Sequence, residues 1–226
     1  MRQIVLDTET TGLSFAAGHR IIEIGCVEIK NYMPTGETFH TYLYPGRLID
    51  PGATQVHGIT DEMLFGKPEF HQIVRPFLEF LGDSPLVIHN APFDMGFING
   101  ELGKIGLNPL PMTRAIDTVK MARTLFPGSP ANLDALCRRF EIDLSARTKH
   151  GALLDAMLLA EVYLQLSGGR QPDLDLLRAD KQKHSVSMMK ERALKPMRHF
   201  QMSEEELLKH KAFVQTLKNP LWEKVG

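Results

Sequence analysis

Five residues along this chain have side chains suited to one kind of chemistry, the hydrolysis of a phosphodiester bond. They are four carboxylates and one imidazole, in chain order Asp7, Glu9, Asp94, His150 and Asp155. Carboxylate oxygens are preferred ligands of hard divalent cations such as Mg²⁺ and Mn²⁺, and an imidazole can take a proton from water. A site with two metal ions that cleaves a phosphodiester needs such a set, so we predict a two-metal hydrolytic site.

The first two carboxylates directly follow an apolar run, residues 4–6, and are two positions apart. Because a β-strand alternates its side chains between two faces, Asp7 and Glu9 project from the same face of one strand. Two threonines and a glycine come next. The glycine lets a substrate backbone approach closely, and a threonine hydroxyl can donate to it. We therefore predict that Thr10 contacts the substrate.

The other three residues lie in, or just before, two predicted helices. Asp94 lies in the first turn after a buried strand, where it either joins the site or compensates the helix dipole. Asp155 lies on the apolar face of a helix over 151–166, where an acid is costly unless it binds metal or pairs with an arginine. Five residues turn about 140° around a helix, so His150 is better placed on the loop before it, from which it can reach the site.

Two further polar residues are candidates for holding the substrate. His57 lies in a loop and Asn90 at the end of a predicted strand. Each is either a structural hydrogen-bonding residue or a substrate contact, and the pattern alone leaves both interpretations open.

Composition indicates one sizeable core with an appendage. The chain has 226 residues, of which 43% are hydrophobic. It has no apolar run long enough for a membrane span and no signal-peptide pattern, so we expect a cytoplasmic protein. Cys26 and Cys137 lie in apolar-periodic segments, which favours core thiols over a disulfide or a metal pair.

Charge divides unevenly along the chain. Residues 1–169 carry 14 Lys or Arg and 19 Asp or Glu, a net charge of −5, whereas residues 170–226 carry 12 and 8, a net charge of +4. An acidic body is unusual in a protein that grips a polyanion by charge alone. Bound divalent cations would supply the missing positive charge, and an ordinary solvated surface is the alternative.

Hydrophobic periodicity predicts alternating strands and helices. We expect strands at 2–8, 20–30, 38–44, 85–89 and 115–119, with a turn at 31–36 and a loop at 45–58. We expect helices after Thr60 and at 69–81, 91–105, 132–140 and 151–166. The first three strands resemble an antiparallel meander, so the pattern predicts a mixed α/β sheet with helices on both faces.

The composition of the sequence changes after residue 169. Residues 170–200 are predicted to be a basic, flexible linker. Residues 203–206 form a capping box, so a helix is expected from there to about residue 218. The apolar residues of segment 201–226 are too few to fold alone and require a partner surface.

A short motif begins this tail. A glutamine is followed by leucines at the third, fifth and sixth positions after it: Gln171, Leu174, Leu176 and Leu177. Such a segment either docks as a linear peptide, with its leucines in a pocket, or is the remnant of a helix.

Three motifs together resemble one family. Residues 7–12 read Asp-x-Glu-Thr-Thr-Gly, residues 89–94 read His-Asn-Ala-x-Phe-Asp, and residues 150–156 read His-x-Ala-x-x-Asp-Ala. In this order and spacing they resemble the DEDDh family of 3′→5′ exonucleases, and within it the members that proofread for a replicative DNA polymerase. The resemblance covers about residues 1–169. It implies a ribonuclease H-like fold and two Mg²⁺ or Mn²⁺ ions.

The resemblance also implies roles and partners. The four carboxylates would hold the metals, His150 would act as the general base, and the substrate would be a single-stranded or frayed 3′ end of DNA, shortened by release of nucleoside monophosphates. Segment 171–177 would bind the sliding clamp, and segment 201–226 the polymerase subunit. A free-standing exonuclease acting on DNA ends or short RNAs is the alternative, and a scaffold without catalysis is a third reading.

Overall fold

The computed structural model describes residues 1–145, 147, 149–168 and 203–217. The chain divides into two compact units, Met1–Asp175 and Leu176–Gly226. The first unit, through residue 168, contains the sheet and all the candidate site residues that the structure describes. The second is described only for the helix α8, Glu204–Gln215, and its flanking residues.

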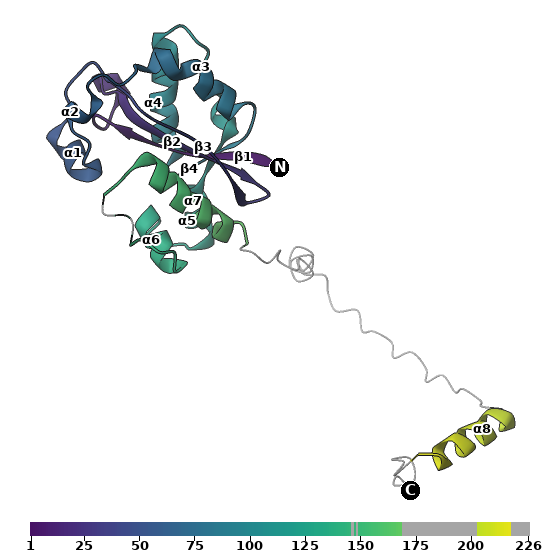
Figure 1. The fold of residues 1–226 in the computed structure, drawn as a ribbon. Coiled ribbons are helices and arrows are strands. Elements are labelled where there is room, and N and C mark those ends of the chain that lie inside the picture. Colours follow the sequence, from purple (N-terminus) through teal and green to yellow (C-terminus); the bar gives the residue numbers. More distant parts are fainter. Residues whose placement is uncertain (146, 148, 169–202, 218–226) are drawn as a thin grey trace, which may run out of the picture. The chain divides into compact units, whose positions relative to one another are not determined.

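A five-stranded mixed sheet forms the centre of the first unit, in the order β3-β2-β1-β4-β5 (Figure 1). Its strands are β1 Arg2–Thr10, β2 Ile21–Lys30, β3 Met33–Tyr42, β4 Leu86–Ile88 and β5 Ala115–Asp117. The first three pair antiparallel, β4 pairs parallel with β1, and β5 pairs parallel with β4. The predicted meander and mixed sheet are therefore confirmed.

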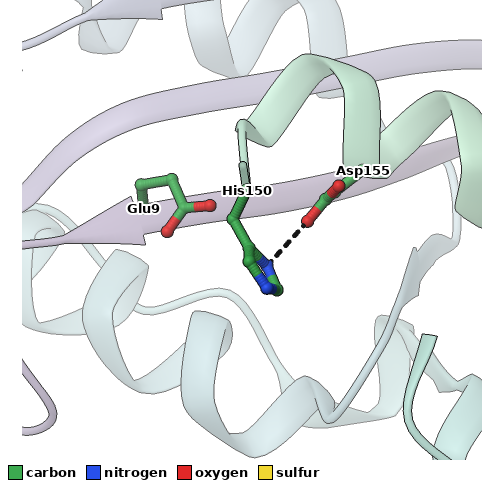
Figure 2. Close-up of side chains that lie close together, drawn as sticks. All are labelled: Glu9, His150 and Asp155. Atoms are coloured by element: carbon green, nitrogen blue, oxygen red, sulfur yellow. Dashed lines mark hydrogen bonds and ion pairs between the residues drawn. The ribbon is translucent and has the colours of Figure 1, made fainter. Parts of the chain in front are cut away.

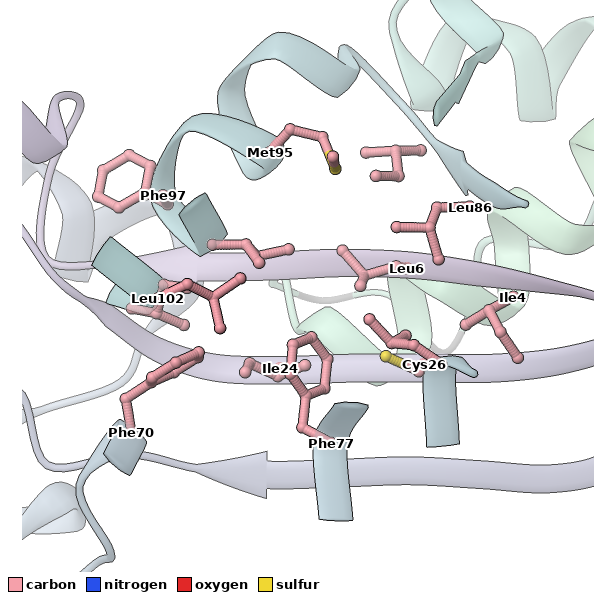
Figure 3. Close-up of a cluster of buried hydrophobic side chains, with 14 of the residues drawn as sticks. Ile4, Leu6, Ile24, Cys26, Phe70, Phe77, Leu86, Met95, Phe97 and Leu102 are labelled. Carbon is pink, nitrogen blue, oxygen red and sulfur yellow. The ribbon is translucent and has the colours of Figure 1, made fainter. Parts of the chain in front are cut away.

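Helices cover both faces of this sheet (Figure 1). One face packs against α3, Phe70–Leu81, and α4, Ala91–Lys104, whereas the other packs against α5, Thr118–Leu125, α6, Leu133–Arg139, and α7, Ala152–Leu166. The alternation of β1 sets which side chains go where. Ile4 and Leu6 enter the α3–α4 core beside Phe77 and Met95 (Figure 3), and Val5 enters the opposite core.

The same alternation determines the placement of the acids at the end of β1. Asp7 and Glu9 share the parity of Val5, so they lie on the α7 side of the sheet. Gly25 of β2 makes the close approach of α7 possible, because a Cβ there would lie 2.3 Å from the backbone of Ala152. The N-terminus of α7 is thereby brought against the strands that carry the acids.

Two predicted boundaries were wrong. The segment predicted as loop contains α1, Pro51–His57, whose first residue is a proline and whose C-cap is Gly58 at φ 74°. Proline suits the first helical position and glycine the position after the last, so the signal was present in the sequence. The turn predicted at 31–36 is only the residue pair Asn31 and Tyr32, both at positive φ, and β3 begins directly after them.

The last predicted strand was also too long. β5 ends at Asp117, whose carboxylate accepts a hydrogen bond from the Val119 amide and so caps α5. Three short elements complete the unit: α2 Asp61–Leu64, which Thr60 precedes as predicted, and the 3₁₀ turns Phe15–Ala17 and Met112–Arg114.

The predicted capping box of the second unit is confirmed. Ser203 accepts from the Glu206 amide, and the Glu206 carboxylate accepts from the Ser203 amide, so α8 begins as expected and ends at Gln215. Leu208 and Phe213 are 68% and 62% exposed.

Both cysteines are free and buried, as expected. They lie in the cores on opposite faces of the sheet, Cys26 beneath α3 and α4 and Cys137 in α6. Burial raises the pKa of both thiols. Among the helices that the structure describes, none is long and apolar enough to cross a membrane.

Candidate active site

The predicted site residues converge from three elements. Asp7 and Glu9 stand near the end of β1, Asp94 in the first turn of α4, and Asp155 in the first turn of α7. His150 lies on the segment just before α7, outside the helix, as the sequence predicts. The ligand atoms of Glu9, His150 and Asp155 lie within 4.8 Å of one another, with the imidazole between the two carboxylates (Figure 2).

Asp94 is fixed to the neighbouring strand. Its Oδ1 accepts hydrogen bonds from the Thr8 amide at 3.1 Å and from the Thr8 hydroxyl at 2.7 Å. The side chain is nearly fully buried. These bonds aim the carboxylate at β1, so compensation of the helix dipole is not its only role in the fold. The negative charge of Asp94 is felt by Asp7, whose pKa it helps to raise.

The carboxylates resist losing their protons in the absence of a cation. Burial raises the pKa of Asp7 well above its usual range, and the charges of Asp94, Glu9 and Asp155 raise it further. Burial, followed by the charges of Asp155 and Glu23, raises the pKa of Glu9 to about 8. Burial also raises the pKa of Asp94 to about 7, against the opposing effect of the bonds from Thr8.

This donor set fits divalent cations. Carboxylates that crowd one another in a partly buried site repel when ionised, and a bound cation removes that repulsion. Carboxylate oxygens are ligands that hard divalent cations prefer, and the accessible imidazole beside them can take a proton from water. The chemistry of the residues therefore agrees with the metal site that the sequence predicts.

An arginine that the sequence analysis did not select also enters the site. Nε of Arg147 lies 2.6 Å from Oδ1 of Asp155, and Nη2 lies 2.7 Å from Oδ2. Arg147 also contacts Asp134 of α6, and its Nη2 lies 2.8 Å from Nδ1 of His150. Pairing of Asp155 with an arginine, left open by the sequence, thus occurs within the same cluster as the candidate metal ligands.

Asp155 consequently differs from the other three carboxylates. Burial opposes its ionisation, but the hydrogen bonds from Arg147 and His150 outweigh burial and lower the pKa of Asp155. Nδ1 of His150 lies 3.1 Å from Oδ2 of Asp155, and the His150 side chain is 45% exposed. The imidazole is therefore held by a carboxylate on one side and open to solvent, where water is available.

Glu23 is a second residue that the sequence analysis missed. It lies opposite Glu9 in the β1–β2 register and is only 3% exposed. One carboxylate oxygen accepts from the Ala152 amide at 3.1 Å, and the other lies 2.7 Å from Nε2 of His40. Glu23 thus ties the first residue of α7 to the sheet and fixes the segment that carries His150.

The candidate substrate contacts are in different situations. The Thr10 hydroxyl donates to the Gly12 carbonyl at 2.7 Å and so serves the local turn. His57 is buried, its Nδ1 accepts from the Ile59 amide at 3.0 Å, and its Nε2 has no partner among the described residues. Since Nδ1 is an acceptor, Nε2 carries the proton and is a buried donor. Burial lowers the pKa of His57, which favours this neutral form.

Asn90 has an unusual backbone. It stands at φ 68°, in the left-handed region, and as the N-cap of α4 it makes no side-chain capping bond. Strained non-glycine residues of this kind cluster at functional sites. The four candidate clamp-binding residues, Gln171, Leu174, Leu176 and Leu177, lie outside the described residues.

Comparison with known proteins gives consistent results. A family model described as Exonuclease (RNase_T) matches residues 4–163. Exonuclease X, solved in complex with 5′ overhanging duplex DNA, is 26% identical with a TM-score of 0.56, over 73% of this chain and 90% of that one. The nuclease domain of 3′hExo, a DEDDh family member solved with rAMP, is 20% identical with a TM-score of 0.63, over 76% and 94%.

The sheet, its flanking helices and the matching family model define the class: the chain is an exonuclease with the ribonuclease H-like fold of DEDDh enzymes, a fold that implies divalent metal ions. A DNA polymerase III subunit epsilon of Rickettsia felis is 46% identical over 222 residues, 96% of this chain and 97% of that protein. The chain belongs to the family of DNA polymerase III epsilon subunits.

Proposed function

We propose that this chain is the proofreading subunit of a DNA polymerase III, a 3′→5′ exonuclease that removes mismatched terminal nucleotides from DNA and releases nucleoside 5′-monophosphates. The observation that carries the proposal is the length of the similarity. The Rickettsia felis relative matches the tail as well as the nuclease body. A free-standing exonuclease would need to share only the body, so the similarity of the tail favours a subunit over the alternative.

The site residues are assigned as follows. Asp7, Glu9, Asp94 and Asp155 would hold two Mg²⁺ or Mn²⁺ ions, which supply charge stabilisation at the scissile phosphate when bound. His150 takes the proton of the attacking water, for which its solvent-open position and its contact with Asp155 suit it. Arg147 and Glu23 position Asp155 and the His150 segment.

Substrate selection rests on access rather than on reading bases. A mismatched end frays at a cost of a few kcal/mol at most, and a site that admits single strands therefore prefers it. His57 offers a buried, unpartnered Nε2–H to the terminal nucleotide. The Asn90 side chain makes no capping hydrogen bond to α4, and Thr10 lies in the turn that follows Asp7 and Glu9.

The remaining assignments concern the C-terminal tail and the cellular location of the complex. We assign residues 1–169 to catalysis, segment 171–177 within 170–200 to the beta sliding clamp, and segment 201–226 to the polymerase alpha subunit. The exposed Leu208 and Phe213 of α8 support the last assignment, since a helix of this length needs a partner to bury its apolar residues. We place the complex in the cytoplasm.

Degradation of a 3′-mismatched primer–template in Mg²⁺ tests this function. We expect stepwise loss of 3′ nucleotides from the mismatch, abolished in Asp7→Ala and raised by added clamp. A variant with Gln171, Leu176 and Leu177 changed to alanine should keep the basal rate and lose the clamp effect. Activity on single-stranded RNA but not on the mismatch, with no response to clamp, would instead indicate a free-standing exonuclease.

A further inference from the structure

A groove of about 510 Å³ adjoins the active site on the side of α5. It is lined by residues from the end of β4, the start of α4, the start of α5 and the residues before α6: His89, Asn90, Pro92, Asp117, Val119, Lys120, Arg123, Ala131 and Asn132. His89 and Asn90 connect the groove with the active site, because they directly precede α4, whose first turn carries Asp94. The groove therefore begins beside the helix end that holds one of the candidate metal ligands.

Two cations on one helix face define the chemistry of the groove. Lys120 and Arg123 are three residues apart on α5, so their side chains are neighbours, with Cβ atoms about 5–6 Å apart. Both are exposed, and neither forms an ion pair within the part of the chain that the structure describes. Two unneutralised positive charges in a body of net charge −5 are a local exception to its acidity.

The other residues that line the groove complement a sugar–phosphate chain. Pro92, Val119 and Ala131 give apolar surface suited to sugars, and the amides of Asn90 and Asn132 can donate. Asp117 is the acid in the groove, and its Oδ1 is occupied by the amides of Val119 and Asn90 at 3.0 and 3.3 Å. Its charge is thus partly satisfied by backbone donors rather than directed wholly at the groove.

We propose that this groove binds the phosphodiester backbone of the DNA strand upstream of the nucleotide being removed, with Lys120 and Arg123 as its phosphate contacts. The inference rests on the proposed function, because it assumes that the 3′ end of a strand occupies the carboxylate site. Phosphate contacts of this kind position a strand without reading its sequence. They also explain how an acidic body holds a polyanion beyond the metal site.

The test compares two substrates of one site. An oligothymidylate has upstream phosphates, whereas the p-nitrophenyl ester of thymidine 5′-monophosphate has only the scissile one. In Lys120→Gln/Arg123→Gln, the ratio of kcat/KM on the oligonucleotide to kcat/KM on the ester should fall about tenfold. For the oligonucleotide, the slope of log KM against the logarithm of the salt concentration should decrease by about 1.4, because two contacts to a single strand are lost.

A matched variant controls for net charge. Lys30→Gln/Arg75→Gln removes two exposed positive charges from β2 and α3, away from the groove, and should leave both the ratio and the slope unchanged. An unchanged ratio in the groove variant, or an equal fall in the control variant, would overturn the proposal. If the unaltered protein cleaves neither substrate, the proposed function fails. Failure of the groove proposal alone gives a different result, an active protein whose ratio does not change in the groove variant.

Discussion

Arg147 and Asp155 form a bidentate ion pair, with Nε and Nη2 of the arginine 2.6 and 2.7 Å from the two carboxylate oxygens. The pair is nearly buried, at 6% and 4% side-chain exposure. Its guanidinium also reaches Asp134 and His150. A single residue therefore connects α6, the His150 segment and the start of α7, and it places a positive charge beside a candidate metal ligand.

Replacing Arg147 by alanine should destabilise the metal-free protein. A buried carboxylate left without its donors costs about 1–3 kcal/mol, which lowers Tm by about 2–12 °C for a domain of this size. Mn²⁺ should restore more of the Tm in the variant than in the unaltered protein, because a cation replaces the missing charge. Thermal unfolding in EDTA measures this, with Arg138→Ala of α6 as the control, and an unchanged Tm would contradict it.

His150→Ala should separate metal binding from turnover. The four carboxylates remain, so Mn²⁺ affinity should change little, whereas the rate should fall by about 10²–10⁴, the usual contribution of a general base. Calorimetric titration with Mn²⁺ and single-turnover cleavage measure the two quantities. His71→Ala on α3 removes an exposed histidine as the control. Full activity of His150→Ala at neutral pH would exclude it from the general-base role.

The crowded carboxylates predict a pH dependence of stability without metal. In the unfolded chain the pKa values of these carboxylates are about 4. In the folded protein the pKa of Glu9 is about 8, that of Asp94 is about 7, and that of Asp7 is raised. Between pH about 4 and about 8 the folded state therefore binds more protons than the unfolded state, and the free energy of unfolding falls as pH rises over this range.

Thermal unfolding in EDTA across this range tests the prediction. We expect Tm to fall toward pH 8 in the unaltered protein, and the fall to be smaller in Asp7→Asn, which removes one repelling charge. Saturating Mn²⁺ should abolish the fall, because the cation takes the place of the protons. A Tm that rises over the same pH range in EDTA would show that the repulsion between the carboxylates is not the dominant effect.

Glu23→Ala should lower kcat by about tenfold while changing KM little. The substitution releases the Ala152 amide and so loosens the His150 segment, and residues of this supporting kind typically contribute about 10–100-fold. Glu23→Gln keeps an oxygen acceptor for that amide and should retain most of the activity. Equal losses in both variants would indicate that the charge of Glu23, rather than its hydrogen bond to α7, is what matters.

The sequence predicted the parts of this molecule that local pattern governs. The alternation of β1 placed Asp7 and Glu9 on one face, and the turn angle of a helix correctly left His150 outside α7. The helix α1 was missed because its apolar pattern is weak, although Pro51 and Gly58 mark its ends.

Residues joined by tertiary contact were beyond prediction from pattern. Glu23 occupies a strand position where an acid is usually solvent-facing, and only the packing of α7 against Gly25 buries it. Arg147 has no periodic signal, since its role depends on how its segment folds over α6 and α7. The groove at Lys120 and Arg123 likewise exists only because β4, α4 and α5 meet.

The proposed mechanism requires Asp7, Glu9, Asp94 and Asp155 together to hold two divalent ions. Calorimetric titration of the full chain with Mn²⁺, in the presence of thymidine 5′-monophosphate, tests it most directly. We expect two ions per chain in the unaltered protein and in His150→Ala, and loss of binding in Asp7→Ala. A single ion, or two ions bound with unchanged affinity in Asp7→Ala, would contradict it.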